Sequence, residues 1–306
     1  MSNAPKISVI MPVFHCGRYL SLAIESILQQ TFTDFELLVV TESDGDPEDF
    51  KTIASFADPR LRHLQHHEGH GIVPSLNTGI KAAQGQYIAR MDGDDISLPN
   101  RFEKQVQFLE QHPDIGAVGT QAQKINEHGE KLDLLALPTT HHLIAWTMAF
   151  KNPMAHPSVM IRKEVLQKET YTTEFLSEDY WLWARLIKQI RFANLAESYL
   201  LYRFYPQSTT VRLSSETQQS SFLIRKRYWQ SFLSLSDEEF TNLDQALKGK
   251  ADRIGTFLRA LKNLQKFRKS FMDHSHPTPP DSSIINRDYR QKIKTSTRWF
   301  IKKKLF

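Results

Sequence analysis

The sequence predicts an α/β fold in which helices cover both faces of a mostly parallel sheet, followed by a C-terminal helical region. Apolar runs of strand length alternate with segments of helical periodicity in the first part of the chain, which is the pattern of β-α-β units. The runs are continuously apolar, as in strands buried on both faces. Of the 306 residues, 40% are hydrophobic and 24% charged, which is typical of globular proteins and excludes a disordered chain.

The predicted elements follow one another in a regular order. Strands are expected at 6–14, 35–40, 61–65, 86–91 and 115–120, and helices at 17–30, 75–84 and 99–111. Beyond these, a short strand is expected at 158–161, a helix at 177–189, an extended segment at 192–204 and helical structure from 216 to about 272. No stretch approaches the roughly 20 apolar residues that span a bilayer. The single cysteine, Cys16, excludes an intrachain disulfide and fits a reducing cytoplasm.

The charges divide the chain into two regions with different expected partners. Residues 1–220 hold 20 Lys and Arg against 26 Asp and Glu, whereas residues 221–306 hold 19 against 8. We expect an α/β domain over 1–215, a helical region over 216–273, and a linker with a basic aromatic tail over 274–306. The prolines and small polar residues of HSHPTPPDSS are typical of a linker.

An acidic cluster, Asp92, Asp94 and Asp95, follows the predicted strand 86–91. In open α/β sheets, ligands bind outside the carboxyl ends of the strands. A bound cation would relieve the repulsion among these carboxylates, and their hard oxygens favour Mg²⁺ or Mn²⁺. The cluster is therefore a candidate metal site, and an acidic turn or helix cap is the alternative.

Two other acidic segments have comparable positions. The segment TESDGDPED follows the strand 35–40, where a carboxylate can accept hydrogen bonds from a base or a ribose, unless it forms an ordinary Asp-Gly turn. Asp179 lies at the start of a predicted helix, where it is either a helix cap or a general base. Trp183, one turn later, either stacks on a sugar ring or packs in the core.

These motifs occur together in one order, and in this the chain resembles the family 2 glycosyltransferases with the GT-A fold. The resemblance covers about residues 5–212. The matching segments are ISVIMPVFHCGRYLSLAIESILQQTFTDFELLVV, LNTGIKAAQGQYIARMDGDDISLPNRFEKQVQFLEQHPDIGAVGT, HPSVMIRKEVL, SEDYWLWARL and LYRFYPQST. The resemblance implies transfer of a sugar from a nucleotide-diphospho-sugar, with a UDP-sugar favoured, to a hydroxyl of a glycan or lipid-linked acceptor in cell-surface polysaccharide synthesis.

The resemblance also implies which residues bind the donor. They are Pro12, Val13, Phe14, Glu42, Asp44, Asn77, Lys81, Asp92, Asp94 and Arg203. Glu42 or Asp44 would hold the base or ribose, and both remain candidates because two extra residues follow the strand. Arg203 falls in the segment that closes over the diphosphate, where Tyr205 replaces the usual His.

The metal ligand, the base and the acceptor residues follow from the same resemblance. Asp94, together with Asp95, matches the position that holds Mn²⁺ or Mg²⁺. Asp179 matches the catalytic base of inverting members, which takes the proton of the acceptor hydroxyl. His156, Glu178 and Trp183 are expected near the acceptor.

The last segment, 284–306, lies outside the resemblance. It carries eight Lys and Arg against Asp288 alone, interleaved with Tyr289, Trp299, Phe300 and Phe306. This composition favours either a solvated helical face or binding to an anionic membrane surface. The expected location is cytoplasmic, and peripheral attachment to the inner face of the membrane is the alternative that the tail offers. No nucleic-acid-binding motif accompanies it. The alternative to an enzyme is a non-catalytic nucleotide-sugar-binding or assembly protein on the same fold. A dehydrogenase is disfavoured, because no G-x-G-x-x-G follows the first strand.

Overall fold

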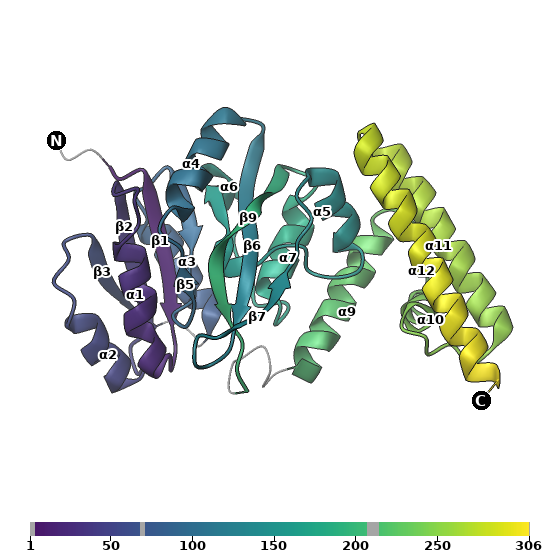
Figure 1. Ribbon diagram of the computed structural model, residues 1–306, viewed down its shortest axis with the longest axis horizontal. Coiled ribbons are helices and arrows are strands. Elements are labelled where there is room, and N and C mark those ends of the chain that lie inside the picture. The colour runs from purple at the N-terminus through teal and green to yellow at the C-terminus, as the bar shows by residue number, and fades with distance from the viewer. Residues whose placement is uncertain (1–3, 68–70, 207–213, 306) are drawn as a thin grey trace. The chain divides into compact units, whose positions relative to one another are not determined.

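The computed structural model describes residues 4–67, 71–206 and 214–305 (Figure 1). The chain divides into two compact units. The sheet unit comprises Met1–Thr139 and Asn152–Ser220, and the helical unit comprises Thr140–Lys151 and Ser221–Phe306. The expected end of the α/β domain, residue 215, lies close to this division. The assignment of 140–151 to the helical unit is a feature that the sequence did not predict.

The sheet unit is built on nine strands, counted over the described residues, in the order β3-β2-β1-β4-β8-β6-β9-β5, with β7 paired to β6. Their bounds are β1 Ile7–Val13, β2 Phe35–Glu42, β3 Leu61–His66, β4 Tyr87–Arg90, β5 Ile96–Ser97, β6 Ile115–Ile125, β7 Lys131–Leu135, β8 Met160–Arg162 and β9 Arg191–Arg203. The pairs β1–β2, β2–β3, β1–β4 and β6–β9 are parallel. The short strands β5 and β7, which the sequence pattern missed, pair antiparallel to their neighbours.

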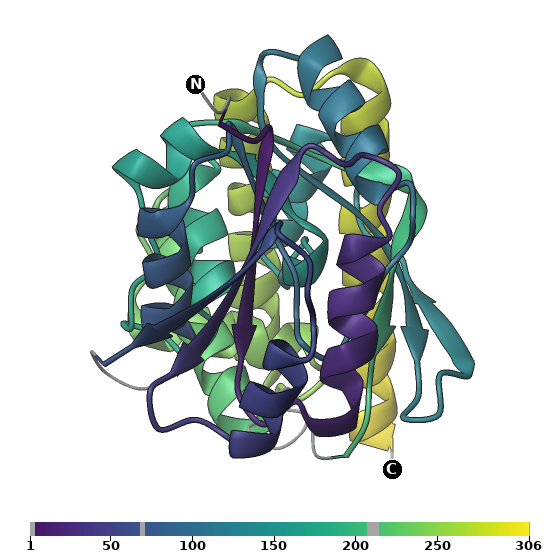
Figure 2. The ribbon, with the colours of Figure 1, turned by 90° about the vertical axis from the view of Figure 1, so that its left-hand side faces the viewer.

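Helices cover both faces of this sheet, as predicted (Figure 2). Their bounds are η1 Gly17–Tyr19, α1 Leu20–Leu28, α2 Pro47–Ala54, α3 Ile72–Ala82, α4 Arg101–Gln111, η2 His156–Ser158, α6 Lys163–Lys168 and α7 Glu178–Leu186. Alternate residues of β1 point to opposite faces. Val9 packs in the core that contains α1 and α4, whereas Ile10 faces α3, where a Cβ on Gly79 would lie 2.5 Å from it. Gly79 therefore allows α3 to approach the sheet closely.

The register of the parallel strands gathers several loops at one edge of the sheet. Val13 of β1 is level with Thr41 of β2, and Ile10 of β1 is level with Arg90 of β4. The loops that leave β1, β2 and β4 therefore emerge at the same edge, where ligands bind in open α/β sheets. This places the residues after Arg90 beside those after Val13.

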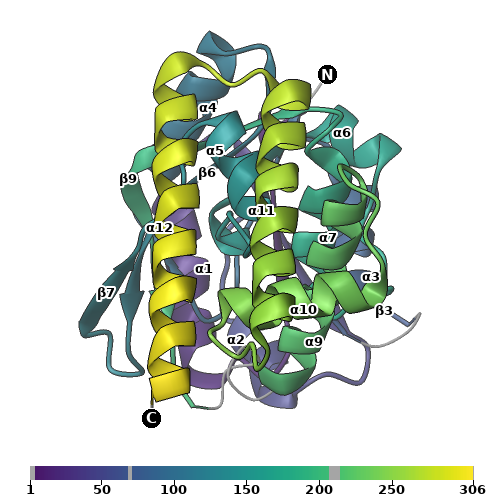
Figure 3. The same ribbon diagram turned by 90° about the vertical axis from the view of Figure 1, so that its right-hand side faces the viewer.

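The helical unit contains α5 His141–Met148, most of α9 Ser214–Gln230, α10 Asp237–Leu247, α11 Ile254–Ser275 and α12 Pro279–Leu305. Figure 3 shows α11 and α12 running side by side. Only residues 276–278 separate these two helices, so most of the predicted linker 274–283 is helical. The prolines at the start of α12 are compatible with a helix, because a first-turn residue needs no N–H bond.

The basic tail is therefore a helix, and its aromatic residues are not all exposed. The ring of Phe300 is buried and stacks on Phe257 at a centroid distance of 4.5 Å, so Phe300 belongs to the core of the helical unit. Trp299 and Ile301 are exposed, and Phe306 lies outside the described residues. Within the described ranges, no helix is both long enough and apolar enough to cross a membrane.

Candidate active site

The acidic turn after β4 brings three carboxylates together. One oxygen from each of Asp92, Asp94 and Asp95 lies within 4.8 Å of the others. Burial and the charge of Asp92 raise the pKa of Asp94 to about 6, and burial raises the pKa of Asp95 well above its usual range. The turn thus concentrates negative charge that a cation would stabilise.

Residues at the end of β9 hold this turn in place. The backbone N–H of Arg203 donates to Asp95 Oδ1 at 2.7 Å, and its Nε donates to the carbonyl of Asp94 at 2.8 Å. Its Nη1 donates to the carbonyl of Asn126 at 3.0 Å, and the guanidinium lies 4.3 Å from the ring centroid of Tyr19. The hydroxyl of Tyr205 donates to Asp94 Oδ2 at 3.1 Å.

The loop after β1 packs against the same turn. A Cβ on Gly93 would lie 2.5 Å from the Cys16 Sγ, so a glycine is needed where the two loops touch. Asp49 holds the β1 loop from the other side, accepting hydrogen bonds from the N–H groups of Cys16 and Gly17 at 3.1 and 3.0 Å. The close packing places Val13 next to the acidic turn, since a Cβ on Gly93 would lie 3.4 Å from Val13 Cγ2, and Phe14 is exposed.

Arg90, the last residue of β4, is the buried counter-charge of this region. Its Nη1 forms an ion pair with Asp92 Oδ1, and only 4% of the residue is exposed. Burial works to lower the pKa of Arg90, but the charges of Asp92 and Glu178 outweigh it, so the net shift is upward. Arg90 therefore stays charged and links the acidic turn electrostatically to the start of α7.

A second group of polar side chains surrounds His156. Its Nε2 lies 2.7 Å from the Tyr171 hydroxyl and its Nδ1 lies 3.5 Å from Glu178 Oε1. Burial, together with the charge of Arg90, lowers the pKa of His156 to about 3, and the charges of Asp179 and Asp92 oppose that shift. The imidazole is therefore neutral, and carboxylates from α7 and from the acidic turn both act on it.

Asp179 is held in a defined orientation at the start of α7. The amide of Asn152 donates to its Oδ2 at 2.6 Å, and the N–H of Tyr180 donates to its Oδ1 at 2.6 Å. Burial and the neighbouring Glu178 raise the pKa of Asp179. A carboxylate with a raised pKa is a better proton acceptor near neutral pH, which suits a general base.

Known proteins resemble this chain in sequence and in fold. The family described as "Glycosyl transferase family 2" matches residues 8–169 of this chain. The chain belongs to this family. It is a glycosyltransferase with the GT-A fold, as the sequence predicted.

Individual relatives agree with this assignment. The chain is 37% identical to the O-antigen biosynthesis glycosyltransferase WbnJ of Escherichia coli over 238 residues, which cover 74% of this chain and 92% of WbnJ. Its fold is similar to that of S. aureus TarS 1–349 in complex with UDP-GlcNAc, with a TM-score of 0.58 and 16% identity over 96% of this chain and 92% of TarS. It is also similar to the mannosyltransferase PcManGT from Pyrobaculum calidifontis, in complex with GDP-Man and Mn²⁺, with a TM-score of 0.56 and 14% identity over 98% of this chain and 86% of PcManGT.

Several predicted donor residues of this family 2 glycosyltransferase contact other parts of the protein. Glu42 accepts a hydrogen bond from the N–H of Gly71 at 2.6 Å, whereas Asp44 is exposed in the turn after β2. Asn77 donates to the carbonyl of Tyr171 at 3.0 Å. The guanidinium of Arg203 donates to backbone carbonyls and its N–H donates to Asp95, so in this structure Arg203 positions the acidic turn.

Two predicted site residues are not brought to the acidic turn. Lys81 is exposed at the end of α3, and because α3 runs back against the parallel strands, that end lies at the amino edge of the sheet. Trp183 is completely buried and contacts Phe192 and His156 edge to face. Its indole therefore has no open face for a sugar ring, and the prediction of a role at the acceptor is wrong for this residue.

Three side chains of the site were missed from the sequence: Arg90, Asn152 and Tyr171. Arg90 gave a usable signal, since an arginine in a buried strand needs a nearby anion. Asn152 is 27 positions from its partner Asp179, and Tyr171 is 15 positions from its partner His156. Both lie in segments without a clear sequence pattern. Only the fold brings these side chains together.

The residues present fit a divalent metal ion. The carboxylates of Asp92, Asp94 and Asp95 are hard oxygen ligands within reach of one another. The Oδ2 of Asp95 is buried and has no hydrogen-bond partner, which is costly for a carboxylate oxygen unless a cation or water contacts it.

Proposed function

We propose that this glycosyltransferase is a metal-dependent, inverting enzyme. It would move a sugar from a nucleotide-diphospho-sugar to a hydroxyl of a glycan or lipid-linked acceptor. The observation that carries the proposal is the acidic turn, where one oxygen from each of Asp92, Asp94 and Asp95 lies within 4.8 Å of the others and suits a metal ion. Asp179, which Asn152 holds in one orientation, suits the base.

The proposed reaction is a single displacement at the anomeric carbon of the donor. The acceptor oxygen forms a bond to that carbon, the bond from the carbon to the diphosphate oxygen breaks, and Asp179 takes the acceptor proton. A divalent ion held by Asp94 and Asp95 would stabilise charge on the departing diphosphate. Asn152 keeps Asp179 in one orientation, and the neutral His156 contacts Tyr171 and Glu178 without adding charge beside the base.

The donor and the pathway are proposed from the relatives. WbnJ is an O-antigen biosynthesis enzyme, which supports a role in cell-surface polysaccharide synthesis. TarS and PcManGT are described in complex with UDP-GlcNAc and with GDP-Man and Mn²⁺, so the fold accommodates either nucleotide. We favour a UDP-sugar.

We also propose that the end of the α11–α12 pair attaches to an anionic membrane surface. Residues 221–306 hold 19 Lys and Arg against 8 Asp and Glu. Leu258 follows Phe257, and Ile301 follows Phe300, in two antiparallel helices whose phenylalanines stack. Both exposed side chains therefore lie on the same side of the pair, beside basic residues, and this pattern suits a lipid headgroup region. Binding to vesicles with and without phosphatidylglycerol tests this part, and equal binding to both would refute it.

A thermal-shift panel of UDP-, GDP- and dTDP-sugars, each with and without Mn²⁺, tests the proposed function. A donor that binds the native state raises the melting temperature, and it should do so only when Mn²⁺ is present. The same mixture should slowly release nucleoside diphosphate. A non-catalytic nucleotide-sugar-binding protein would give the shift without the release, and no shift with any donor would refute the proposal.

A further inference from the structure

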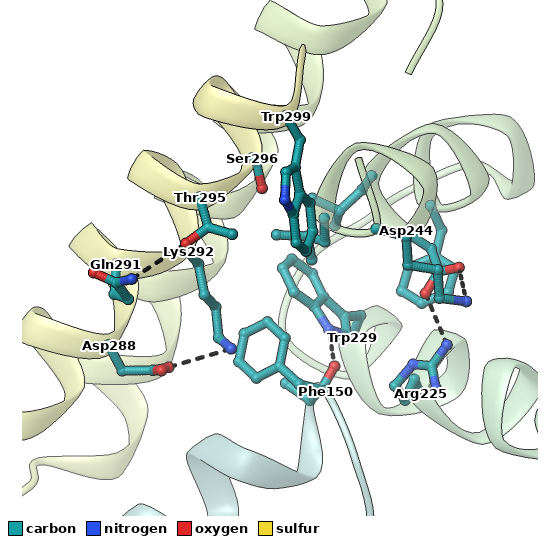
Figure 4. A pocket seen from close by; sticks show the side chains of 15 residues that line it. Phe150, Arg225, Trp229, Asp244, Asp288, Gln291, Lys292, Thr295, Ser296 and Trp299 are labelled. Atoms are coloured by element: carbon teal, nitrogen blue, oxygen red, sulfur yellow. Dashed lines mark hydrogen bonds and ion pairs between the residues drawn. The ribbon is translucent and has the colours of Figure 1, made fainter. Parts of the chain in front are cut away.

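The helical unit contains a cavity that shares no residue with the acidic turn or the Asp179 region. Its volume is about 370 Å³, which is within the range of small-molecule sites. Its walls come from the end of α5 and from α9, α10 and α12 (Figure 4). The aromatic lining residues are Phe150, Trp229, Phe240 and Trp299.

Two tryptophans form walls of this cavity. Trp229 stacks on Phe267 at a centroid distance of 3.8 Å, and its Nε1 donates to the carbonyl of Ala149 at 2.8 Å. The Trp229 ring is thus fixed before any ligand arrives, which lowers the cost of binding. The exposed Trp299 lies against Gly249, which has a φ of +71° and where a Cβ would lie 2.7 Å from the indole.

A buried hydroxyl faces the same space. Ser296 lines the cavity beside Trp299 (Figure 4) and is only 1% exposed. No hydrogen bond to its hydroxyl is found among the described residues. The Ser296 hydroxyl is therefore available to a ligand or a water molecule in the cavity.

Each of the three basic side chains of the lining is paired with one of its two carboxylates. Asp244 pairs with Arg225 at 2.7 Å and with Lys248 at 2.6 Å. Lys292 lies 3.5 Å from Asp288 and 4.1 Å from the ring centroid of Phe150. A strongly charged ligand, such as a diphosphate, would find no free cation among them. The cavity instead offers aromatic faces, hydroxyls and amides to an uncharged ligand.

We propose that this cavity binds a neutral sugar unit of a glycan, through its aromatic walls and Ser296. A pyranose ring combines an apolar C–H face with a rim of hydroxyls, which matches Trp229 and Trp299 beside Ser296. The proposal rests on the proposed use of a glycan acceptor and adds a second place where this glycan is held. A polyprenyl chain fits less well, because it would leave the Ser296 hydroxyl unpaired.

Saturation-transfer NMR of the full chain tests the proposal, with lactose, maltose and N,N′-diacetylchitobiose as probes. At least one of these sugars should receive saturation from the protein at a sugar concentration of about 10 mM or below. Ser296→Ala should weaken its affinity about fivefold, as expected for one lost hydrogen bond, without lowering the melting temperature, because the hydroxyl has no protein partner. Trp299→Ala should weaken it about tenfold. The matched controls on α12, Ser283→Ala and Ile284→Ala, are both exposed and should bind like the wild type.

Three outcomes would overturn the proposal: no probe receives saturation, the two cavity variants bind like the wild type, or farnesol displaces the sugar. Asp94→Asn separates this proposal from the proposed function. Sugar binding that is lost in Asp94→Asn and kept in Ser296→Ala would place the sugar in the sheet unit and refute the cavity alone. If the two cavity variants weaken sugar binding but the wild type binds no nucleotide donor, the proposed function alone is refuted.

Discussion

The side-chain amide of Asn152 donates a hydrogen bond of 2.6 Å to the Asp179 carboxylate. The two residues are 27 positions apart, and the amide fixes one oxygen of Asp179 while the N–H of Tyr180 fixes the other. A hydrogen bond to the ionised form also lowers the pKa of a carboxyl group. Asn152 thus fixes the orientation of the proposed base and opposes the rise that burial and Glu178 give to its pKa.

Asn152→Ala should move the acid limb of the kcat/KM profile to higher pH. Removing the amide takes away an interaction that lowers the pKa of Asp179, and the base works only when ionised. Activity is therefore lost at a higher pH than in the wild type. The exposed Asn100 provides a control, Asn100→Ala. An unchanged profile in the Asn152 variant would show that this carboxylate does not govern the rate.

Glu178→Gln should change how stability depends on pH. Burial raises the pKa of Glu178 from 4.5 to about 7, so the folded state holds a proton that the unfolded state releases between these values. The wild type therefore loses stability as pH rises from about 4.5 to about 7, by up to about 3 kcal/mol. Glutamine cannot ionise, so the free energy of unfolding of the variant should not fall in this way. Urea unfolding at pH 5 and pH 8 measures the free energy of unfolding of both proteins. Equal pH dependence in the two would contradict the burial of an ionisable Glu178.

Arg203→Met should destabilise the protein by about 2–4 kcal/mol, because several charge-assisted bonds to buried carbonyls are lost. The same variant distinguishes the structural role from the donor-binding role expected from the sequence. If Arg203 only positions the acidic turn, its substitution lowers the free energy of unfolding, and donor affinity falls only because the turn becomes less ordered. If the variant kept its stability in urea and lost only donor affinity, Arg203 would contact the diphosphate.

Asp94→Asn should abolish the Mn²⁺-dependent part of the donor thermal shift. The substitution removes one ionised ligand from the acidic turn, and divalent ions bind amide oxygens more weakly than carboxylates. The melting temperature without ligands should be nearly unchanged, because the turn keeps its contacts with Arg203. A variant that retained the full Mn²⁺ effect would place the metal elsewhere.

The sequence predicted those features that depend on local pattern. The continuous apolar runs of β1 and β2 and the acidic turn after β4 were all recognisable, because period and neighbouring residues specify them. It did not predict contacts such as His156 with Tyr171 or Asn152 with Asp179, because these depend on tertiary packing. Trp183 illustrates the same limit: helical spacing placed it on the face of Asp179, but only the packing of α7 on the sheet buries it. The linker 274–283 was mispredicted because prolines are tolerated in the first turn of α12.

The most direct test of the whole account is the turnover of Asp179→Asn with its donor and acceptor. Asparagine has nearly the same shape but cannot accept the acceptor proton, so turnover should fall by about 10²–10⁴-fold, while the Mn²⁺-dependent donor thermal shift stays at the wild-type value. Near-normal turnover in this variant would contradict the assignment of Asp179 as the base.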